Sequence, residues 1–467
     1  MSGEVMKFDV AVVGSGPGGY IAAIRASQLG MRTAVIEREW LGGICLNWGC
    51  IPTKALLESA RLLDEMRRAG EFGLVCDGPA PDWGSIVKRS RNAAKRMTKG
   101  VEYLMKRNRI EVIAGSASLV APGRLDVDID GNVKSVEAGN IIFATGARPR
   151  ELPGLVFDGT HIVTYREAMT FSALPGRVLI VGAGAIGTEF AYLYAVMGCE
   201  VTLVELMERI LPLEDAEVSS TLQRSFKRRG IAVYTSSRIE AVERTVNGAR
   251  RYTIAGPHGE TEVIADVCLV AVGVRANIEG LGLEEAGVHT EHGFIKVDDH
   301  LRTNVPGIWA IGDCIGPPLL AHAAAREGIV AAEDIAGKPG AGIDYGNVPT
   351  AVYCHPQVAS VGLTEHRAKE AGLKIKVGKY LFRANGRAVA GGETDGFVKF
   401  VVDADSGAVI GVHIIGPGAP ELLPEVVLAR GRGLTAREIA DMVHAHPTLS
   451  EAVMEAAGDA FGSAIHV

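Results

Sequence analysis

The chain has 467 residues, which is more than a single hydrophobic core usually organises, so we expect two to four domains. Hydrophobic residues make up 47% and charged residues 22%, as in ordinary globular proteins, and the net charge of −7 disfavours a nucleic-acid partner. No apolar stretch approaches the roughly 20 residues of a membrane span, and no secretory leader is evident. We therefore expect a cytoplasmic protein without a membrane span.

The first predicted element is an apolar strand that runs into a glycine-rich turn with the spacing G-x-G-x-x-G, formed by Gly14, Gly16 and Gly19. A helical pattern follows, and the next strand ends at Glu37. Such glycines permit a tight turn and a close approach of the backbone to a pyrophosphate, and the acid can accept a hydrogen bond from a ribose hydroxyl. One copy alone is weak evidence, because a simple glycine turn has the same appearance.

The segment GGICLNWGCIPTK follows and holds two cysteines, Cys45 and Cys50. In a regular helix, residues five apart would have Cα atoms roughly 8 Å apart, beyond the disulfide range of about 4.4–6.8 Å. A bond between them therefore needs a distorted turn, which the neighbouring glycines permit. Pro52 suits the first turn of the next helix, so Cys50 would lie near a helix N-terminus that favours a thiolate, with the positive charge of Lys54 nearby.

This pair suits a reactive dithiol, and the alternative is half of a zinc site. A four-ligand zinc site needs partners with similar local pairing. The other five cysteines stand singly, and we expect them to be core or surface residues: Cys76, Cys199, Cys268, Cys314 and Cys354. The sequence therefore predicts no metal.

The dinucleotide fingerprint recurs with Gly182, Gly184 and Gly187, and its second strand is expected to end at Glu205. Each acid follows the first glycine of its copy at the same offset. Two complete copies argue against coincidence and indicate two bound dinucleotides, for which a flavin and a nicotinamide are the usual redox pair. Glu205 would repel a 2′-phosphate, which favours NAD over NADP, although Arg209 follows shortly after.

Near the C-terminus, HAHPTLSE places His446 before Pro447, which can open a helix, with Glu451 about one turn inside it. A carboxylate that hydrogen-bonds one imidazole nitrogen fixes the tautomer and raises the basicity of the other nitrogen. Thiol chemistry needs such a base because the thiolate is the nucleophile. On sequence alone the alternative is a helix-capping histidine. His444 lies two residues earlier, and we expect it to be structural.

With these motifs in place, the chain resembles the flavoprotein pyridine nucleotide–disulfide oxidoreductases over nearly its whole length. GGICLNWGCIPTK is the most specific shared motif, and the other similar segments are IIFATGARPR, ADVCLVAVGVRAN, GIWAIGDCIGPPLLAHAAAREG and HAHPTLSE. Departures from the common pattern, none of which removes a reacting group, are Trp48, Thr53, Val274, Ala276 and Ala324. The resemblance implies an α/β fold with two dinucleotide-binding (Rossmann-like) domains and a C-terminal α+β dimerisation domain.

The expected domains are an FAD-binding domain over residues 1–150, an NAD-binding domain over 151–275, a central segment over 276–345 that completes the FAD domain, and a dimerisation (interface) domain over 346–467. In the last domain, KFVVDADSGAVIGVHIIG predicts a strand, a turn and a strand. We expect His355 and Pro356 to lie in a loop there, with an interface role rather than a catalytic one.

The resemblance also implies roles for individual residues. Cys45 would exchange with the substrate sulfur and Cys50 would face the flavin. His446 with Glu451 would manage the thiol protons across the interface of a homodimer. Lys54, paired with Glu189, would tune the flavin near its reactive nitrogen. The other expected contacts with FAD and NAD are Gly14, Gly16, Gly19, Glu37, Gly115, Thr145, Gly146, Gly182, Gly184, Gly187, Glu205, Gly273, Asp313, Ala321 and His322.

The activity implied is the oxidation of a protein-bound dihydrolipoyl group with NAD⁺ through the Cys45/Cys50 disulfide and FAD. Partners would be the lipoyl domains and core acyltransferase of 2-oxo acid dehydrogenase complexes, or the lipoyl protein of glycine cleavage, because we expect no lipoyl module in the chain itself. Glutathione-type reductases normally use NADPH, which Glu205 disfavours. Mercuric reductases use extra cysteines near the C-terminus, which this chain lacks. A non-catalytic redox-sensing flavoprotein would need an inert dithiol, and the intact base motif argues against it.

Overall fold

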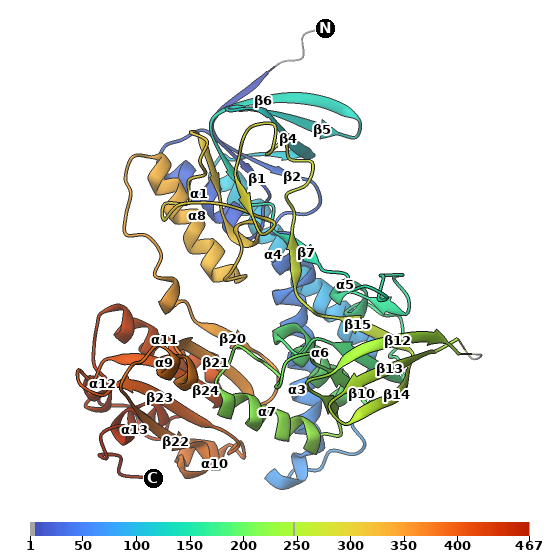
Figure 1. Ribbon diagram of the computed structural model, residues 1–467, viewed down its shortest axis with the longest axis vertical. Helices are drawn as coiled ribbons and strands as arrows, with labels where there is room; N and C mark the ends of the chain where they lie inside the picture. The colour runs from blue at the N-terminus through green and yellow to red at the C-terminus, as the bar shows by residue number, and fades with distance from the viewer. Residues whose placement is uncertain (1–4, 246–247, 467) are drawn as a thin grey trace. The chain divides into compact units, whose positions relative to one another are not determined.

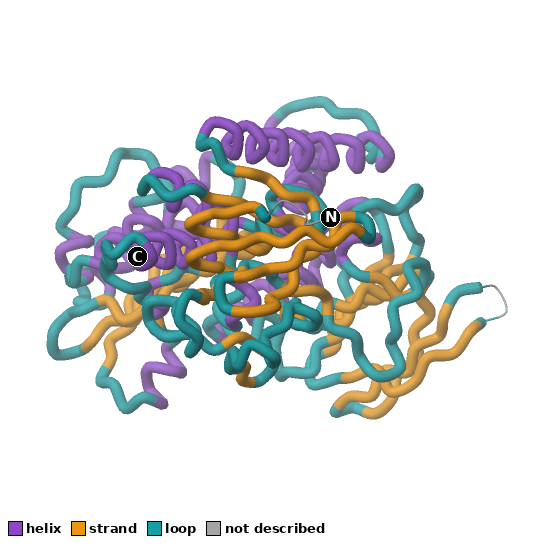
Figure 2. The backbone as a smooth tube through the Cα atoms, turned by 90° about the horizontal axis from the view of Figure 1, so that it is seen from above, coloured by secondary structure: helices purple, strands orange, loops and turns teal. Residues whose placement is uncertain are grey.

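The computed structural model describes residues 5–245 and 248–466, so the outermost ends of the first and last expected domains lie outside the described residues. The chain folds into two compact units, and each is assembled from three separate segments of the sequence. The first unit contains the chain up to Ala55, Ser85–Arg150 and Gly273–Tyr345; the second contains Leu56–Gly84, Glu151–Val272 and the chain from Gly346 onward. Each unit contains helices together with a parallel sheet, which confirms the predicted α/β class (Figures 1 and 2).

The first unit is built on a seven-stranded sheet. Six of its strands have the order β3-β2-β1-β6-β5-β4, and the seventh, β19, pairs with the C-terminal end of β6. The strands β3, β2, β1, β6 and β19 run parallel, whereas β4 and β5 form an antiparallel extension. Their bounds are Met6–Val13 (β1), Thr33–Glu37 (β2), Glu111–Ala114 (β3), Ser116–Ala121 (β4), Arg124–Ile129 (β5), Asn132–Phe143 (β6) and Ile308–Ala310 (β19). Val10, Ala11 and Val12 of β1 are completely buried, as expected for a parallel strand covered on both faces.

Helices α1 (Pro17–Gln28) and α8 (Ala321–Ile335) pack against each other in this unit (Figure 1). Their approach depends on Gly328, where an added Cβ would lie 2.5 Å from the carbonyl oxygen of Gly18. The remaining elements of the unit are α2 (Gly43–Trp48), η2 (Gly312–Ile315), the pair β7 (Ala147–Pro149) and β16 (Val274–Ala276), and the pair β17 (Thr290–Glu291) and β18 (Phe294–Ile295). The residues of α3 (Cys50–Arg67), α4 (Trp83–Arg107) and η3 (Tyr345–Asn347) divide between the two units.

The second unit contains a parallel sheet with the order β11-β10-β9-β15-β8 and an antiparallel sheet of β12, β13 and β14. The bounds are Ile162–Val163 (β8), Arg177–Val181 (β9), Glu200–Val204 (β10), Ala232–Tyr234 (β11), Arg238–Arg244 (β12), Arg250–Gly256 (β13), Gly259–Ala265 (β14) and Val267–Val270 (β15). The associated helices are η1 (Ala69–Phe72), α5 (Tyr165–Ala168), α6 (Ala185–Met197) and α7 (Ala216–Arg228). This is the second dinucleotide-binding fold that the repeated fingerprint predicts.

The C-terminal part of the second unit is an antiparallel sheet with the order β20-β21-β24-β23-β22. Its strands are Thr350–Val352 (β20), Gln357–Gly362 (β21), Ile375–Leu381 (β22), Phe397–Asp403 (β23) and Val409–Gly416 (β24), and its helices are Glu365–Glu370 (α9), Phe382–Ala384 (η4), Gly386–Ala390 (α10), Ala419–Gly431 (α11), Ala436–Ala440 (α12) and Glu451–Asp459 (α13). The predicted strand, turn and strand are confirmed as β23 and β24. Their turn is closed by Asp403, whose carboxylate accepts a hydrogen bond from the backbone N–H of Ser406 at 2.7 Å.

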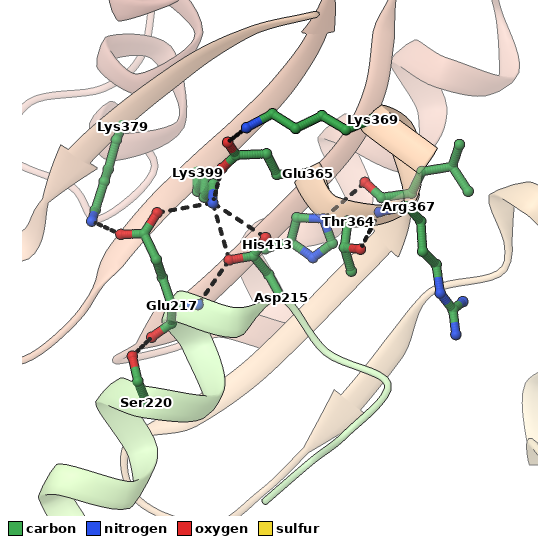
Figure 3. Close-up of polar contacts among 11 residues, drawn as sticks. Asp215, Glu217, Ser220, Thr364, Glu365, Arg367, Lys369, Lys379, Lys399 and His413 are labelled. Atoms are coloured by element: carbon green, nitrogen blue, oxygen red, sulfur yellow. Dashed lines mark hydrogen bonds and ion pairs between the residues drawn. The ribbon is translucent and has the colours of Figure 1, made fainter. Parts of the chain in front are cut away.

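Buried charges connect α7 to this antiparallel sheet (Figure 3). Lys399 on β23 is 1% exposed, and its ammonium group lies 3.1 Å from Asp215, 2.9 Å from Glu217 and 2.7 Å from Glu365. Burial alone lowers the pKa of Lys399, but the hydrogen bonds to Glu217 and Glu365 reverse the shift and raise it above its usual value. The lysine therefore stays charged inside the unit because three carboxylates compensate it.

No helix in the described ranges contains a stretch that is both long and apolar enough to cross a membrane.

Candidate active site and dinucleotide-binding loops

The glycine turn between β1 and α1 leaves one open position between two crowded ones. Gly14 has φ +97°, and an added Cβ would lie 2.3 Å from the carbonyl oxygen of Ala144. At Gly19 an added Cβ would lie 2.0 Å from the carbonyl oxygen of Gly14. At Gly16 nothing lies within 4 Å of such an atom. The outer glycines therefore make the turn and the packing possible, while the middle one leaves space for a ligand to approach the backbone.

The turn between β9 and α6 repeats this arrangement. Gly182 has φ +98°, and its added Cβ would lie 2.5 Å from the carbonyl oxygen of Ala271. At Gly187 an added Cβ would lie 1.8 Å from the carbonyl oxygen of Gly182, and at Gly184 nothing lies within 4 Å. The predicted duplication is thus reproduced at the level of individual backbone contacts.

The two predicted ribose acceptors also occupy equivalent positions. Glu37 is the last residue of β2, and its carboxylate accepts a hydrogen bond from the backbone N–H of Ser15 at 2.9 Å. Glu205 accepts one from the backbone N–H of Ala183 at 2.6 Å and lies one residue beyond the end of β10, rather than within the strand as predicted. Each carboxylate is therefore held beside the open glycine of its own turn.

Both turns fit a bound dinucleotide. Each presents an open glycine, a helix N-terminus and a positioned carboxylate, which are the groups that recognise a pyrophosphate and a ribose. The chemistry of these donors and acceptors thus fits one dinucleotide at each turn.

Further predicted FAD contacts surround the first turn. Gly115 donates its backbone N–H to the carbonyl oxygen of Glu37 at 2.9 Å. Thr145 and Gly146 lie two and three residues beyond the end of β6. Their carbonyl oxygens accept hydrogen bonds from the side chain and backbone of Asn277 at 3.0 and 2.9 Å. Asn277 ends the segment ADVCLVAVGVRAN, but the sequence does not predict its role, because its partners lie more than a hundred positions earlier.

Asp313 lies in η2, and Ala321 and His322 are the first residues of α8. Burial raises the pKa of the Asp313 carboxyl above its usual value. Gly273, with φ +99°, begins the third segment of the first unit, and its carbonyl oxygen accepts a hydrogen bond from the backbone N–H of Arg150 at 3.1 Å.

The residue that fixes η2 is Glu327, which sequence reasoning missed. This side chain is 2% exposed and accepts hydrogen bonds from the backbone N–H of Gly312 at 2.5 Å and from the hydroxyl of Tyr345 at 3.0 Å. Its signal in the sequence is an acid within a helix otherwise rich in alanine, which is ambiguous without the tertiary structure. By holding Gly312, it sets the position of the neighbouring Asp313.

Cys45 and Cys50 form a disulfide, with Cα atoms 4.7 Å apart. The predicted distortion is confirmed: α2 ends at Trp48, Gly49 departs from helical geometry (φ −131°, ψ −111°), and α3 begins at Cys50. An added Cβ at Gly49 would lie 3.3 Å from the Cα of Cys45, so a larger residue would crowd this turn. Cys50 is therefore the first residue of an 18-residue helix, where the helix dipole stabilises a thiolate.

A hydrogen-bond network that sequence reasoning missed supports the segment before the second cysteine. The amide nitrogen of Asn47 donates to the carbonyl oxygens of Leu41 at 3.0 Å and Gly43 at 2.9 Å. The hydroxyl of Thr98, on α4, donates to the amide oxygen of Asn47 at 2.9 Å. These bonds fix α2, and with it Cys45, against α4.

His446 lies outside any helix, and its Nδ1 is 2.9 Å from a carboxylate oxygen of Glu451. The other carboxylate oxygen of Glu451 accepts the backbone N–H of Thr448 at 2.8 Å. This N–H, and then His446, lower the pKa of Glu451 below its usual value despite some burial. The ring of His446 is 78% exposed, so it is oriented by the carboxylate and accessible on its other edge.

The predicted helix start at Pro447 is wrong, because α13 begins at Glu451. The hydroxyl of Thr448 donates a hydrogen bond to the carbonyl oxygen of Ala445 at 2.7 Å, and its backbone N–H donates one to the carboxylate of Glu451. These local bonds stabilise a turn in place of a first helical turn.

Lys54 lies on α3 in the first unit, and Glu189 lies on α6 in the second. Glu189 is 4% exposed and accepts a hydrogen bond from the backbone N–H of Tyr353 at 2.9 Å. The proposed pairing of the two side chains stays a prediction, as does the action of His446 on the dithiol of the other subunit.

His444 differs from its neighbour in being enclosed. Its ring is 7% exposed, with Nε2 3.1 Å from Glu425 and Nδ1 3.1 Å from the carbonyl oxygen of Met442. Both nitrogens are therefore engaged, which agrees with a structural role.

Five cysteines lie outside the disulfide, as predicted. Cys76 is partly exposed, and the other four are buried: Cys199, Cys268, Cys314 and Cys354.

Comparisons with known proteins agree with this geometry. Residues 8–328 match the family model for pyridine nucleotide-disulphide oxidoreductases, and residues 348–457 match the dimerisation domain of the same family. The chain is 46% identical to a dihydrolipoyl dehydrogenase of Rhizobium etli over 98% of this chain and 99% of that protein, and 47% identical to one of Zymomonas mobilis with the same coverage. The crystal structure of LpdA from Mycobacterium tuberculosis matches with a TM-score of 0.89 and 31% identity, over 97% of this chain and 99% of that one.

Proposed function

The chain belongs to the pyridine nucleotide-disulphide oxidoreductases, and on that premise we propose that it is an FAD- and NAD-dependent enzyme that oxidises protein-bound dihydrolipoamide to lipoamide. The observation that carries the reaction class is the Cys45–Cys50 disulfide at the N-terminus of α3. The substrate follows from relatives named dihydrolipoyl dehydrogenase, which match over nearly the full length at 42–48% identity.

The sulfur–sulfur bonds that form and break involve only the two thiols of the substrate and this disulfide, and a base takes up the thiol protons. A thiolate of dihydrolipoamide attacks the sulfur of Cys45, the bond to Cys50 breaks, and Cys50 leaves as a thiolate. The second substrate thiolate then attacks the substrate sulfur of the mixed disulfide, which releases Cys45 and closes the lipoamide ring. Two electrons have moved to the protein, which now holds a dithiol, and the substrate has lost two protons.

We assign the uptake of one of those protons to His446. Its Nδ1 is held by Glu451, so Nε2 is the nitrogen available to a thiol, and the ionised carboxylate stabilises the imidazolium that forms. The segment that carries this pair is a dimerisation domain. We place the pair opposite the dithiol of the second subunit in a homodimer.

FAD, when bound, would supply the redox chemistry that connects the dithiol to NAD⁺. We assign it to the first unit, with Gly14, Gly16, Gly19, Glu37, Gly115, Thr145, Gly146, Asp313, Ala321 and His322. Within residues 151–275 we assign NAD to Gly182, Gly184, Gly187 and Glu205, and Gly273 to the exit from that domain. The segments 1–150 and 276–345 would form the FAD domain, and 346–467 the interface domain.

A substrate panel tests the proposal: oxidation of dihydrolipoamide with NAD⁺ or NADP⁺, and reduction of glutathione disulfide or mercuric ion with NADH or NADPH. We expect the highest kcat/KM for dihydrolipoamide with NAD⁺. A preference for glutathione disulfide or mercuric ion, or for the phosphorylated nucleotide, would contradict the assignment.

The physiological donor would be the lipoyl domain of a 2-oxo acid dehydrogenase acyltransferase or the lipoyl protein of glycine cleavage, in the cytoplasm. Measured activity with lipoylated domains from both systems would decide which complexes the protein serves.

A further inference from the structure

The exposed side of α4 carries an unusual density of positive charge. Lys88, Lys95, Lys99 and Lys106 recur at spacings of seven, four and seven residues, which a helix of 3.6 residues per turn places along one line. Two arginines follow the same line one position further round the helix. We call these six exposed side chains the α4 basic face: Lys88, Lys95, Arg96, Lys99, Lys106 and Arg107. It extends for about 27 Å at 1.5 Å per residue.

These charges are not neutralised by the chain itself. Among the described residues, no carboxylate lies within ion-pair distance of any member of the α4 basic face, and Glu102 is the single acidic side chain that α4 contains. The whole chain, by contrast, has a net charge of −7. A concentrated positive field on a negative protein attracts acidic partners and orients them during approach.

The same helix supports the redox-active segment. Thr98 of α4 hydrogen-bonds Asn47, and the guanidinium of Arg91 lies 4.2 Å from the centre of the Trp48 ring. Both contacted residues lie between the two cysteines. Thr98 is next in sequence to Lys99, so the side of α4 that holds the dithiol segment adjoins the α4 basic face in the first unit.

We propose that the α4 basic face docks the acidic surface of the protein domain that carries the dihydrolipoyl group. This inference rests on the proposed function and names the chemistry of its partner. A lipoyl group reaches the enzyme on a carrier, and a positive field beside the dithiol raises the frequency with which an acidic carrier arrives in a useful orientation. The chemistry of exchange at Cys45 would not depend on it, because free dihydrolipoamide has no such surface.

A second copy of this chain is a poorer occupant because its overall charge is only moderately negative and its family supplies a separate dimerisation domain. A nucleic acid would also bind a basic helix, and the test below distinguishes it.

The experiment uses the holoenzyme with a reduced lipoylated domain of strongly negative net charge, and with free dihydrolipoamide. The test variant is K95E/K99E/K106E. The matched control is K134E/K227E/K338E, which makes the same change in charge at exposed lysines outside α4. At an ionic strength of about 0.02 M, where screening is weak, we expect kcat/KM for the domain to fall at least tenfold in the test variant and less than about threefold in the control. For free dihydrolipoamide, both should remain within about twofold of the wild type.

Screening supplies an independent check. At about 0.5 M salt the Debye length is only a few ångströms, so the test variant and the wild type should converge to within about threefold for the domain. The neutral variant K95Q/K99Q/K106Q should give an intermediate loss. It also retains a good helix-forming composition in case the acidic variant folds poorly.

Equal losses in test and control variants would overturn the proposal, because net charge alone would then explain them. An equal loss with free dihydrolipoamide would also overturn it, by showing that α4 acts on the dithiol and not on docking. If the wild type fails to oxidise free dihydrolipoamide, the proposed function is wrong. Docking is then tested separately by titrating the enzyme with the oxidised lipoylated domain. In that titration the test variant should bind the domain at least tenfold more weakly than the wild type. Loss of binding to a duplex oligonucleotide without any change for the domain would assign the face to nucleic acid.

Discussion

The glycine turn between β9 and α6 allows folding and cofactor binding to be separated by two neighbouring substitutions. Gly184→Ala places a methyl group in open space, at a backbone conformation that alanine adopts freely (φ −72°, ψ −167°). Gly187→Ala places one 1.8 Å from the carbonyl oxygen of Gly182. The first change should affect the binding of NAD, and the second should affect the fold.

The magnitudes follow from these distances. An ordinary contact begins at about 3.4 Å, so Gly187→Ala requires α6 or the turn to move by roughly 1.6 Å, and we expect a loss of about 3 kcal/mol in the free energy of unfolding. Gly184→Ala should leave stability within about 0.5 kcal/mol, or raise it slightly, because it only restricts the unfolded chain. Its methyl group occupies the space where the pyrophosphate would approach, so the Kd for NADH should rise at least about tenfold, or about 1.4 kcal/mol.

Thermal unfolding of the holoprotein and calorimetric titration with NADH measure the two quantities separately. A Gly184→Ala protein that binds NADH with unchanged Kd would refute the position assigned to the nucleotide. A Gly187→Ala protein with an unchanged unfolding midpoint would refute the packing argument. The equivalent pair in the first unit, Gly16→Ala and Gly19→Ala, should divide in the same way between flavin retention and stability.

Other expectations concern single groups. Glu205→Arg should narrow the ratio of kcat/KM for NAD⁺ over NADP⁺ by at least about tenfold, and an unchanged ratio would show that another residue sets it. Mixed dimers of inactive Cys45→Ser and His446→Gln subunits should regain activity if the histidine acts on the other subunit. Cys45→Ser should show a long-wavelength absorption band from a thiolate beside the flavin, which fades in acid; a band in Cys50→Ser instead would reverse the two roles. Because a backbone N–H and His446 lower the pKa of Glu451, its carboxylate stabilises the fold at neutral pH and loses this effect as acid protonates it, so Glu451→Gln should weaken the pH dependence of stability below about pH 5.

The parts of the site that sequence reasoning predicted are those encoded by local backbone rules. Glycine at positive φ, a strand followed by a helix, and an acid at a fixed offset specify Gly14, Gly182 and their turns without knowledge of distant contacts. The strained spacing of the two cysteines likewise predicted a break, which the structure places at Gly49.

What the sequence left open depends on contacts between distant segments or on competing local bonds. The carboxylate of Glu327 accepts a hydrogen bond from the backbone N–H of Gly312, fifteen residues earlier. The side chain of Asn277 donates one to the carbonyl oxygen of Thr145, more than a hundred positions earlier. The start of α13 was misplaced because proline is common at helix starts, whereas here the bonds of Thr448 stabilise a turn.

The position of the dithiol is explained by the fold that the two units share. After the acid of each fingerprint, the chain returns to its own glycine turn: the backbone N–H of Gly42 donates to the carbonyl oxygen of Ser15 at 3.0 Å, and that of Leu211 donates to the equivalent oxygen of Ala183 at 2.8 Å. In the second unit the returning chain continues into α7. In the first it continues into α2 and the disulfide, and it passes so close to the turn that a Cβ on Gly43 would lie 2.7 Å from the Cα of Gly16.

In both units the segment after the acid packs back against the glycine turn. In the first unit this segment carries the two cysteines, so the shared fold brings the reactive sulfurs to the dinucleotide turn. Reactivity then depends on three local features: the break at Gly49, the start of α3 at Cys50, and the support of Asn47 by α4. Removing the support should therefore disturb the dithiol while leaving the glycine turn intact. Thr98→Val, which deletes one hydrogen bond at nearly constant volume, should slow dithiol exchange with little effect on flavin content, whereas loss of flavin in this variant would show that the turn and the dithiol segment are not separable.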